Sequence, residues 1–127
     1  MLKRSLLVIL GAAAALNGAI MLVGPGYWYA TVPGVTHTGL FNSHFVLDIG
    51  IAFLVAGAGL LAGAWQARFW PAALTGAAFL GVHGLLHVAG LVSGQAHSMV
   101  PFELAAVVLP SALAVYAAWP HAKGRAA

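Results

Sequence analysis

Four long apolar stretches constrain this chain more than any other feature of its sequence. They cover residues 5–24, 41–64, 71–92 and 101–119. A helix of about 20 residues, rising about 1.5 Å per residue, crosses a hydrocarbon layer of about 30 Å. Because 62% of the residues are hydrophobic and only 6% are charged, the chain cannot cover a water-exposed surface with polar groups. We therefore expect an all-α integral membrane protein, an antiparallel four-helix bundle formed as one domain by residues 1–127.

The breaks between these stretches support the same division. A Gly-Pro-Gly sequence at residues 24–26 ends the first stretch. Pro71 and Pro101 open the third and fourth, at a position where a helix does not use the missing N–H. Lys3 and Arg4 precede the first stretch as they would in a signal peptide. However, the apolar run is longer than a typical signal core and no A-x-A cleavage site follows it. We expect it to remain as a transmembrane helix.

The five basic residues predict the orientation. In a four-span topology they all fall on one side of the membrane: Lys3, Arg4, Arg68, Lys123 and Arg125. By the positive-inside rule that side is cytoplasmic, so both termini are expected in the cytoplasm of a bacterial inner membrane. Aromatic belts are expected at the outer face (Tyr27, Trp28, Tyr29) and at the inner face (Trp65, Phe69, Trp70, Trp119).

Charge and cysteine content exclude some classes of function. A net charge of +3 without a basic patch does not provide a nucleic-acid footprint. The chain has no cysteine, so it has no disulfide, thiolate metal site or redox thiol. The main partner expected from composition is the lipid bilayer.

Two pairs of polar residues interrupt the apolar stretches at helical spacing. His83 and His87 are four residues apart in the third stretch, as are His44 and Asp48 in the second, so each pair lies on one helix face. The depth of each residue along its helix puts both pairs, Glu103 and Asn17 in the outer half. We expect two facing stripes, one of Gly76, Leu80, His83, His87 and Gly90, the other of His44, Asp48, Ile51, Val55 and Gly59.

A metal site explains these residue types best. An unpaired carboxylate in hydrocarbon costs at least about 2.5–3.5 kcal/mol, and no Lys or Arg lies in the predicted outer half. A divalent cation would neutralise carboxylates and accept neutral imidazoles. The expected ligands of copper, iron or zinc are His44, Asp48, His83 and His87, with Glu103 a further candidate. Asn17 and Asn42 are expected to support the ligands, and His37, His97 and Met99 to mark a route into the site.

Several alternatives remain open. The histidines could instead hydrogen-bond between helices, bind haem b or a quinone, or transfer protons. Asn17 fits a helix-packing role better than a ligand role, and Glu103 fits equally well at the start of the fourth helix or at the interface. A metal with an open coordination position could activate water or oxygen on an apolar substrate, but no catalytic residue can be identified. The chain could also form a homo-oligomer, or be a non-catalytic subunit or assembly factor of a larger membrane complex.

The sequence GLFNSHFVLDIG, residues 39–50, leads into the second stretch and contains Asn42, His44 and Asp48. Together with the histidines of the third stretch, this motif resembles small bacterial four-helix membrane proteins of the DoxX-like group. The resemblance implies a four-span bundle. It also implies an association with quinone-linked sulfur oxidation and membrane redox partners, but no motif assigns that activity to particular residues here.

Overall fold

The computed structural model describes residues 1–94 and 100–120, and every regular element in these ranges is helical. In chain order these elements are α1 (Leu2–Val23), α2 (Pro25–Thr31), η1 (Val35–His37), α3 (Ser43–Trp65), η2 (Ala67–Phe69), α4 (Trp70–Val92), α5 (Val100–Glu103), η3 (Leu104–Val108) and α6 (Leu109–Ala118). Of the three segments designated η, η3 is a π-helical turn that joins α5 to α6. The prediction of an all-α chain is confirmed.

Four spans of the described chain are long and apolar enough to cross a membrane. They are Leu2–Val23, Ser43–Trp65, Ala67–Val92 and Val100–Ala118, each within a few residues of a predicted stretch. The connection between the first two spans contains α2 and η1, which the sequence analysis did not predict. The protein is thus a four-span helical membrane protein.

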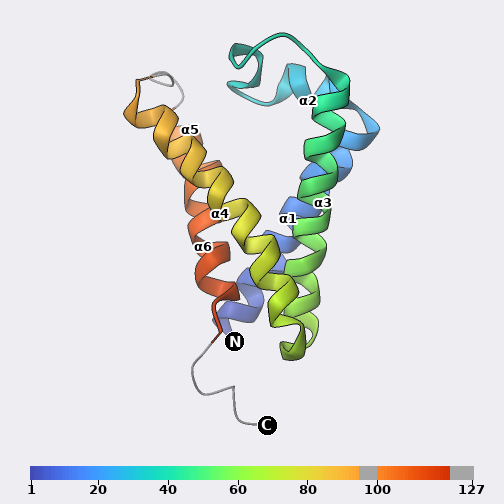
Figure 1. The fold of residues 1–127 in the computed structure, drawn as a ribbon, viewed down its shortest axis with the longest axis vertical. Coiled ribbons are helices and arrows are strands. Elements are labelled where there is room, and N and C mark those ends of the chain that lie inside the picture. Colours follow the sequence, from blue (N-terminus) through green and yellow to red (C-terminus); the bar gives the residue numbers. More distant parts are fainter. Residues whose placement is uncertain (95–99, 121–127) are drawn as a thin grey trace.

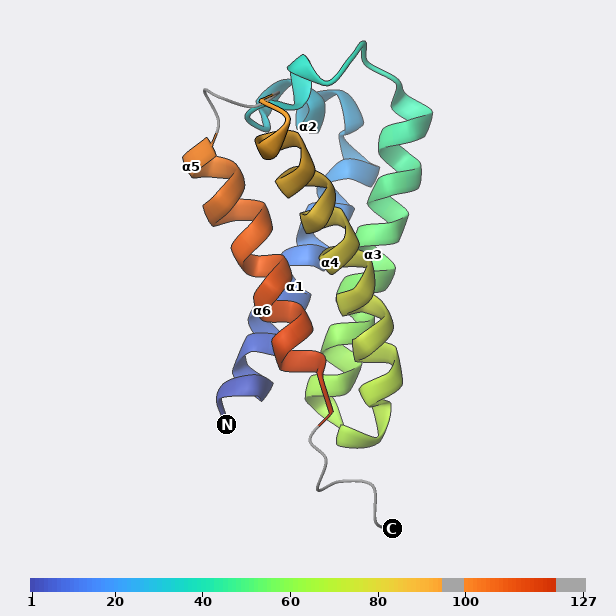
Figure 2. The same ribbon diagram turned by 60° about the vertical axis from the view of Figure 1, so that its left-hand side comes forward.

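The spans pack in sequence order, each antiparallel to the next. α1 lies against α3, α3 against α4, and α4 against α6. Figure 1 shows two helix pairs, α1 with α3 and α4 with α6, that meet near the N-terminus and diverge toward the end that carries α2. Figure 2, turned by 60°, shows α4 diverging from α3 toward the same end. We name these two ends of the bundle the Met1 end and the α2 end.

Glycines seven residues apart bring α1 and α3 into close contact. Gly11 and Gly18 on α1 face Gly57 and Gly50 on α3. A Cβ atom added at Gly57 would lie 2.5 Å from the backbone nitrogen of Ala15, and one at Gly18 would lie 2.5 Å from the carbonyl oxygen of Gly50. Small residues let helix backbones approach closely and gain van der Waals contact. This interface determines which face of α3 turns inward.

The core is concentrated toward the Met1 end. Leu60, Ala77 and Ala114, from α3, α4 and α6, are fully buried there. Gly63 of α3 packs against Ala73 of α4, so the helices of the two pairs are in close contact at this level. Small side chains thus close the bundle at the Met1 end, whereas the pairs separate at the α2 end (Figure 1).

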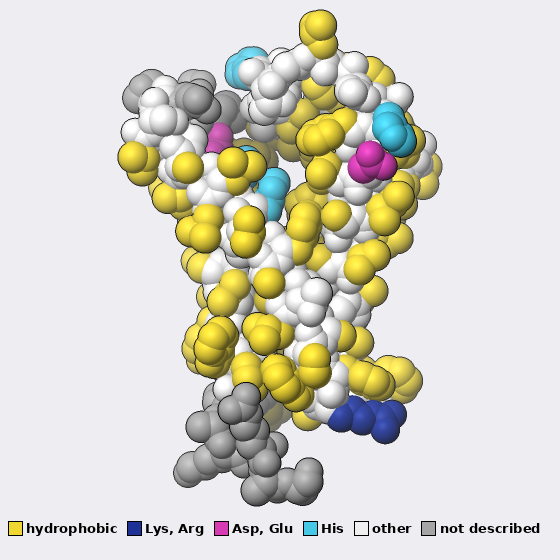
Figure 3. Space-filling model, in the orientation of Figure 1, with side chains coloured by type: hydrophobic (Ala, Val, Ile, Leu, Met, Phe, Trp, Pro, Cys, Tyr) yellow, Lys and Arg dark blue, Asp and Glu magenta, His cyan; other side chains and the backbone are white. Residues whose placement is uncertain are grey.

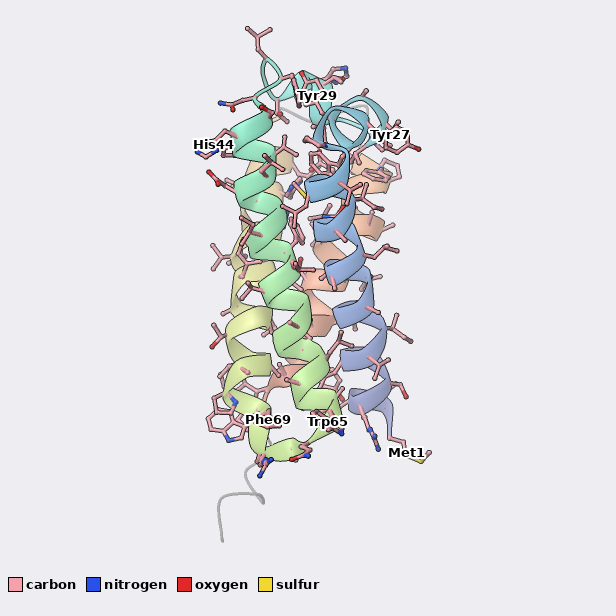
Figure 4. All side chains as sticks on the ribbon, turned by 90° about the vertical axis from the view of Figure 1, so that its right-hand side faces the viewer. Met1, Tyr27, Tyr29, His44, Trp65 and Phe69 are labelled. Atoms are coloured by element: carbon pink, nitrogen blue, oxygen red, sulfur yellow. The ribbon has the colours of Figure 1, made fainter. Side chains whose placement is uncertain are left out.

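Basic and aromatic side chains mark the two ends. All three described basic residues, Lys3, Arg4 and Arg68, lie at the Met1 end. The Lys3 ammonium donates a hydrogen bond to the carbonyl oxygen of Trp119 (3.0 Å), which ties α1 to the end of α6. Figure 4 shows Tyr27 and Tyr29 at the α2 end and Trp65 and Phe69 at the Met1 end, as expected for two aromatic belts. Lys123 and Arg125 lie outside the described residues.

Candidate functional site

A hollow separates the two helix pairs at the α2 end. The space-filling view in Figure 3 shows it in the upper half of the molecule, with histidine and acidic side chains on its wall. The walls around these side chains are otherwise mainly apolar (Figure 3). We call this space the α2-end hollow and describe its polar residues first.

His87 and Glu103 form a close polar contact between α4 and α5. The Nδ1 atom of His87, on α4, lies 3.1 Å from Oε2 of Glu103, the last residue of α5. Their side chains are only 30% and 16% exposed, so the contact is shielded from its surroundings. A carboxylate in an apolar environment needs a polar partner, and the His87 imidazole is that partner for Glu103.

His83 extends this pair toward the centre of the bundle. It lies one helical turn before His87, and the two ring centroids are 4.8 Å apart. The His83 ring meets Phe53 of α3 edge-on at 5.4 Å and is nearly parallel to the Phe79 ring at 6.2 Å. His83, His87 and Glu103 therefore form a continuous polar row whose inner end has aromatic walls.

A widened helical turn follows Glu103 directly. Pro110 has no N–H group, so it cannot donate the usual bond to the carbonyl of Ala106. The N–H of the preceding residue, Leu109, bonds to the carbonyl oxygen of Leu104, five residues earlier, in the π turn η3. Such turns accommodate a break in the helical hydrogen-bond ladder and are frequent at functional sites.

His44 and Asp48 lie elsewhere, on the outward face of α3. Their Nε2 and Oδ2 atoms are 3.7 Å apart, and their side chains are 87% and 57% exposed. Figure 4 shows His44 pointing away from the bundle. The expectation that this pair shares one pocket with His83 and His87 is thus corrected. The physical reason is the rotation of α3, because Gly50 and Gly57 must face α1 to permit the close helix contact.

The structure consequently divides the five expected ligands into two groups. One group is the row of His83, His87 and Glu103, and the other is the exposed pair of His44 and Asp48. Within residues 1–94 and 100–120, no three His, Asp or Glu side chains stand in a metal-binding arrangement as they lie. A metal bound to the row would require a side chain to rotate.

The residues expected to support the ligands have local contacts instead. Asn17 accepts a hydrogen bond from the Trp28 indole N–H (2.9 Å), which fastens α2 to α1. Asn42 accepts one from the backbone N–H of Phe45 and caps α3. Of the residues expected to mark a route, His37 is exposed in η1, and His97 and Met99 lie outside the described residues.

Sequence reasoning missed Phe53 and Phe79 at the site. Phe79 stands four residues before His83, so helical spacing could have placed it on the same face. Phe53 gives no such signal, because its contact with His83 depends on how α3 and α4 pack.

The fold defines the class of this protein as a small four-span helical membrane protein. Searches against protein-family models, curated proteins and solved structures found no match to the chain. No family is identified for the chain, and the DoxX-like resemblance has no support from these comparisons.

Proposed function

We propose that the protein binds a divalent transition-metal ion in the α2-end hollow through His83, His87 and Glu103. The main support is the distance of 3.1 Å between His87 Nδ1 and Glu103 Oε2. Two donors bound to one zinc ion at about 2.0–2.2 Å in tetrahedral geometry stand about 3.3–3.5 Å apart. The pair therefore needs only a small adjustment to hold an ion in place of their shared proton.

His83 would supply the third donor. Its ring already lies 4.8 Å from the His87 ring on the same helix face, so a side-chain rotation is enough to turn a nitrogen toward the ion. Two imidazoles and a carboxylate suit zinc, iron or copper. Three protein ligands leave a position open for water or a substrate atom, so a metal-dependent reaction on a molecule from the bilayer is compatible with this proposal.

A flat organic ligand, such as haem b or a quinone, is the second candidate. The observation that favours it is the aromatic wall, since the His83 and Phe79 rings lie within 11° of parallel. A planar ring could stack in this wall while His83 or His87 binds its polar edge or metal. A Soret band in the absorption spectrum of the purified protein would support haem, and a colourless protein would reject it.

The metal proposal is tested by the affinity for zinc, measured by calorimetry in detergent. Every variant also carries H44A and D48N, so that the exposed pair on α3 cannot contribute. We expect one bound ion, a loss of detectable binding in H83A/H87A, and an affinity at least tenfold lower in E103Q. H37A, which removes an exposed histidine of η1 that is not one of the proposed ligands, is the control and should bind normally. Equal, near-zero binding in all variants would overturn the proposal.

We also infer that the hollow faces the periplasm of a bacterial inner membrane. The support is the position of Lys3, Arg4 and Arg68 at the Met1 end, since basic residues are retained on the cytoplasmic side. In this orientation a metal ion would reach the site from outside the cell. A role as a subunit of a larger membrane complex is compatible with the same orientation, and a stable co-purifying protein would support it.

A further inference from the structure

The outward face of α3 carries a regular stripe from one end of the helix to the other. Its members follow each other at alternating spacings of four and three residues, and all are exposed except the half-buried Ala62. They are His44, Asp48, Ile51, Val55, Ala58, Ala62 and Trp65. This spacing is that of the seam between two parallel helices packed side by side. Below the first two residues the stripe is entirely apolar.

Asp48 is costly on such a face. Its side chain is 57% exposed on a helix that is long and apolar enough to span a membrane. The basic residues within the described ranges, Lys3, Arg4 and Arg68, all lie at the opposite end of the bundle. A carboxylate within the hydrocarbon layer normally has a charged or ligated partner. Among the described side chains, Asp48 has an ion-pair contact with His44 alone.

We propose that two copies of this chain pack through the outward stripe of α3, with one divalent transition-metal ion held between their two His44–Asp48 pairs. Two copies inserted in the same direction are related by a two-fold axis along the membrane normal. Under this symmetry the two α3 helices run parallel, and equal residues meet at equal depth. The two Asp48 carboxylates would repel each other there, whereas a divalent cation neutralises both.

The donor geometry supports a shared ion. Within one copy, His44 Nε2 and Asp48 Oδ2 are 3.7 Å apart, close to the separation of about 3.3–3.5 Å between two ligands of a tetrahedral zinc ion. One copy supplies two donors, which is half of a tetrahedral set. The second copy adds the other two donors and gives a set of two imidazoles and two carboxylates. The four-ligand site therefore forms only in the dimer. This is why a second copy, rather than lipid, is the occupant proposed for the stripe.

The remaining stripe is suited to close packing. Val55, Ala58 and Ala62 are small or β-branched, and such residues let parallel helices approach one another in a membrane. Val55 is 66% exposed near the middle of α3. Val82 offers a matched position, because it is 68% exposed near the middle of α4 but lies on another helix.

Because the chain has no cysteine, these two valines allow a direct test of the face. V55C and V82C are prepared in native membranes and treated with a short thiol-specific bifunctional crosslinker. We expect covalent dimers from V55C and monomers from V82C. Absence of dimers from V55C, or equal yields from both variants, would overturn the interface.

The metal bridge is tested by the mass of the purified protein in detergent, measured by analytical ultracentrifugation. We expect the wild type to be a dimer with zinc and a monomer with EDTA, and D48N to be monomeric in both. H37A should behave as the wild type, and so should H83A/H87A, since its site is separate. A dimer that persists in EDTA or in D48N would overturn the bridge, whatever the outcome for the α2-end hollow.

Discussion

Several of the described polar side chains find partners within the same helix or a neighbouring one. Trp28 and Asn17 illustrate this, because one hydrogen bond of 2.9 Å joins α2 to α1. The Asn17 side chain is part-buried, and its amide also lies 3.6 Å from the Met21 sulfur. A buried polar group without a partner costs more than a hydrogen bond contributes. Such local contacts therefore position the short helix α2 across its end of the bundle.

Replacing Trp28 with Phe should show how much the hydrogen bond between Trp28 and Asn17 stabilises the protein. The variant keeps an aromatic ring but removes the N–H group, which leaves the Asn17 carbonyl oxygen unpaired. We expect a loss of about 0.5–1.5 kcal/mol in the free energy of unfolding, measured by titration with SDS in mixed micelles. Y27F is the control, because Tyr27 is 70% exposed. A W28F variant as stable as Y27F would show that the contact adds nothing.

At the scale of the helix, small residues decide which face turns inward. The glycines of α3 that face α1 recur every seven residues, and a Cβ atom on Gly50 would lie 2.8 Å from the Cβ of Met21. This contact forces His44 and Asp48 to the outside, although their pattern resembles an inward polar face. The rotation of α3 thus places the His44–Asp48 pair away from the His83–His87 pair, although both pairs have the same four-residue spacing.

Substituting Gly57 with Ala should separate α1 from α3. The added methyl group would meet backbone atoms of Gly11 and Ala15, which cannot rotate away. We expect a destabilisation of about 1–3 kcal/mol in the same SDS titration. G90A is the matched control, because nothing lies within 4 Å of a Cβ at Gly90. It should be neutral or stabilising by up to about 1 kcal/mol. Equal effects of both substitutions would contradict the close-packing argument.

The whole molecule is closed at one end and open at the other. Fully buried residues join α3, α4 and α6 near the Met1 end, and the two helix pairs diverge at the α2 end (Figures 1 and 3). The described basic residues lie at the closed end. If basic residues are retained on the cytoplasmic side, this open polar end faces the periplasm, as we propose.

Cysteine labelling tests this orientation. T36C in η1 and A67C in η2 place single thiols in exposed segments at opposite ends of the bundle. In spheroplasts, a membrane-impermeant maleimide should label T36C at once and A67C only after permeabilisation. Both variants should be labelled equally in detergent, which controls for reactivity. The reverse pattern in spheroplasts would place the hollow in the cytoplasm.

The sequence alone was sufficient to predict the four spans, because span length and apolar composition depend only on the solvent that the chain must enter. It was also sufficient to find the polar pairs, since a spacing of four residues puts two side chains on one face of any helix. It could not decide toward which neighbour each face points. That direction depends on the sum of backbone contacts at Gly11, Gly18, Gly50 and Gly57, residues without side chains, whose effect exists only once two helices meet.

The tertiary structure therefore decided which polar residues lie together. It joined Glu103 to His87 across two spans, added Phe53 and Phe79 to the wall beside His83, and left His44 with Asp48 on the outer surface. The physical reason is that close packing of α1 and α3 determined how α3 is rotated about its axis. This rotation placed His44 and Asp48 on the outer surface.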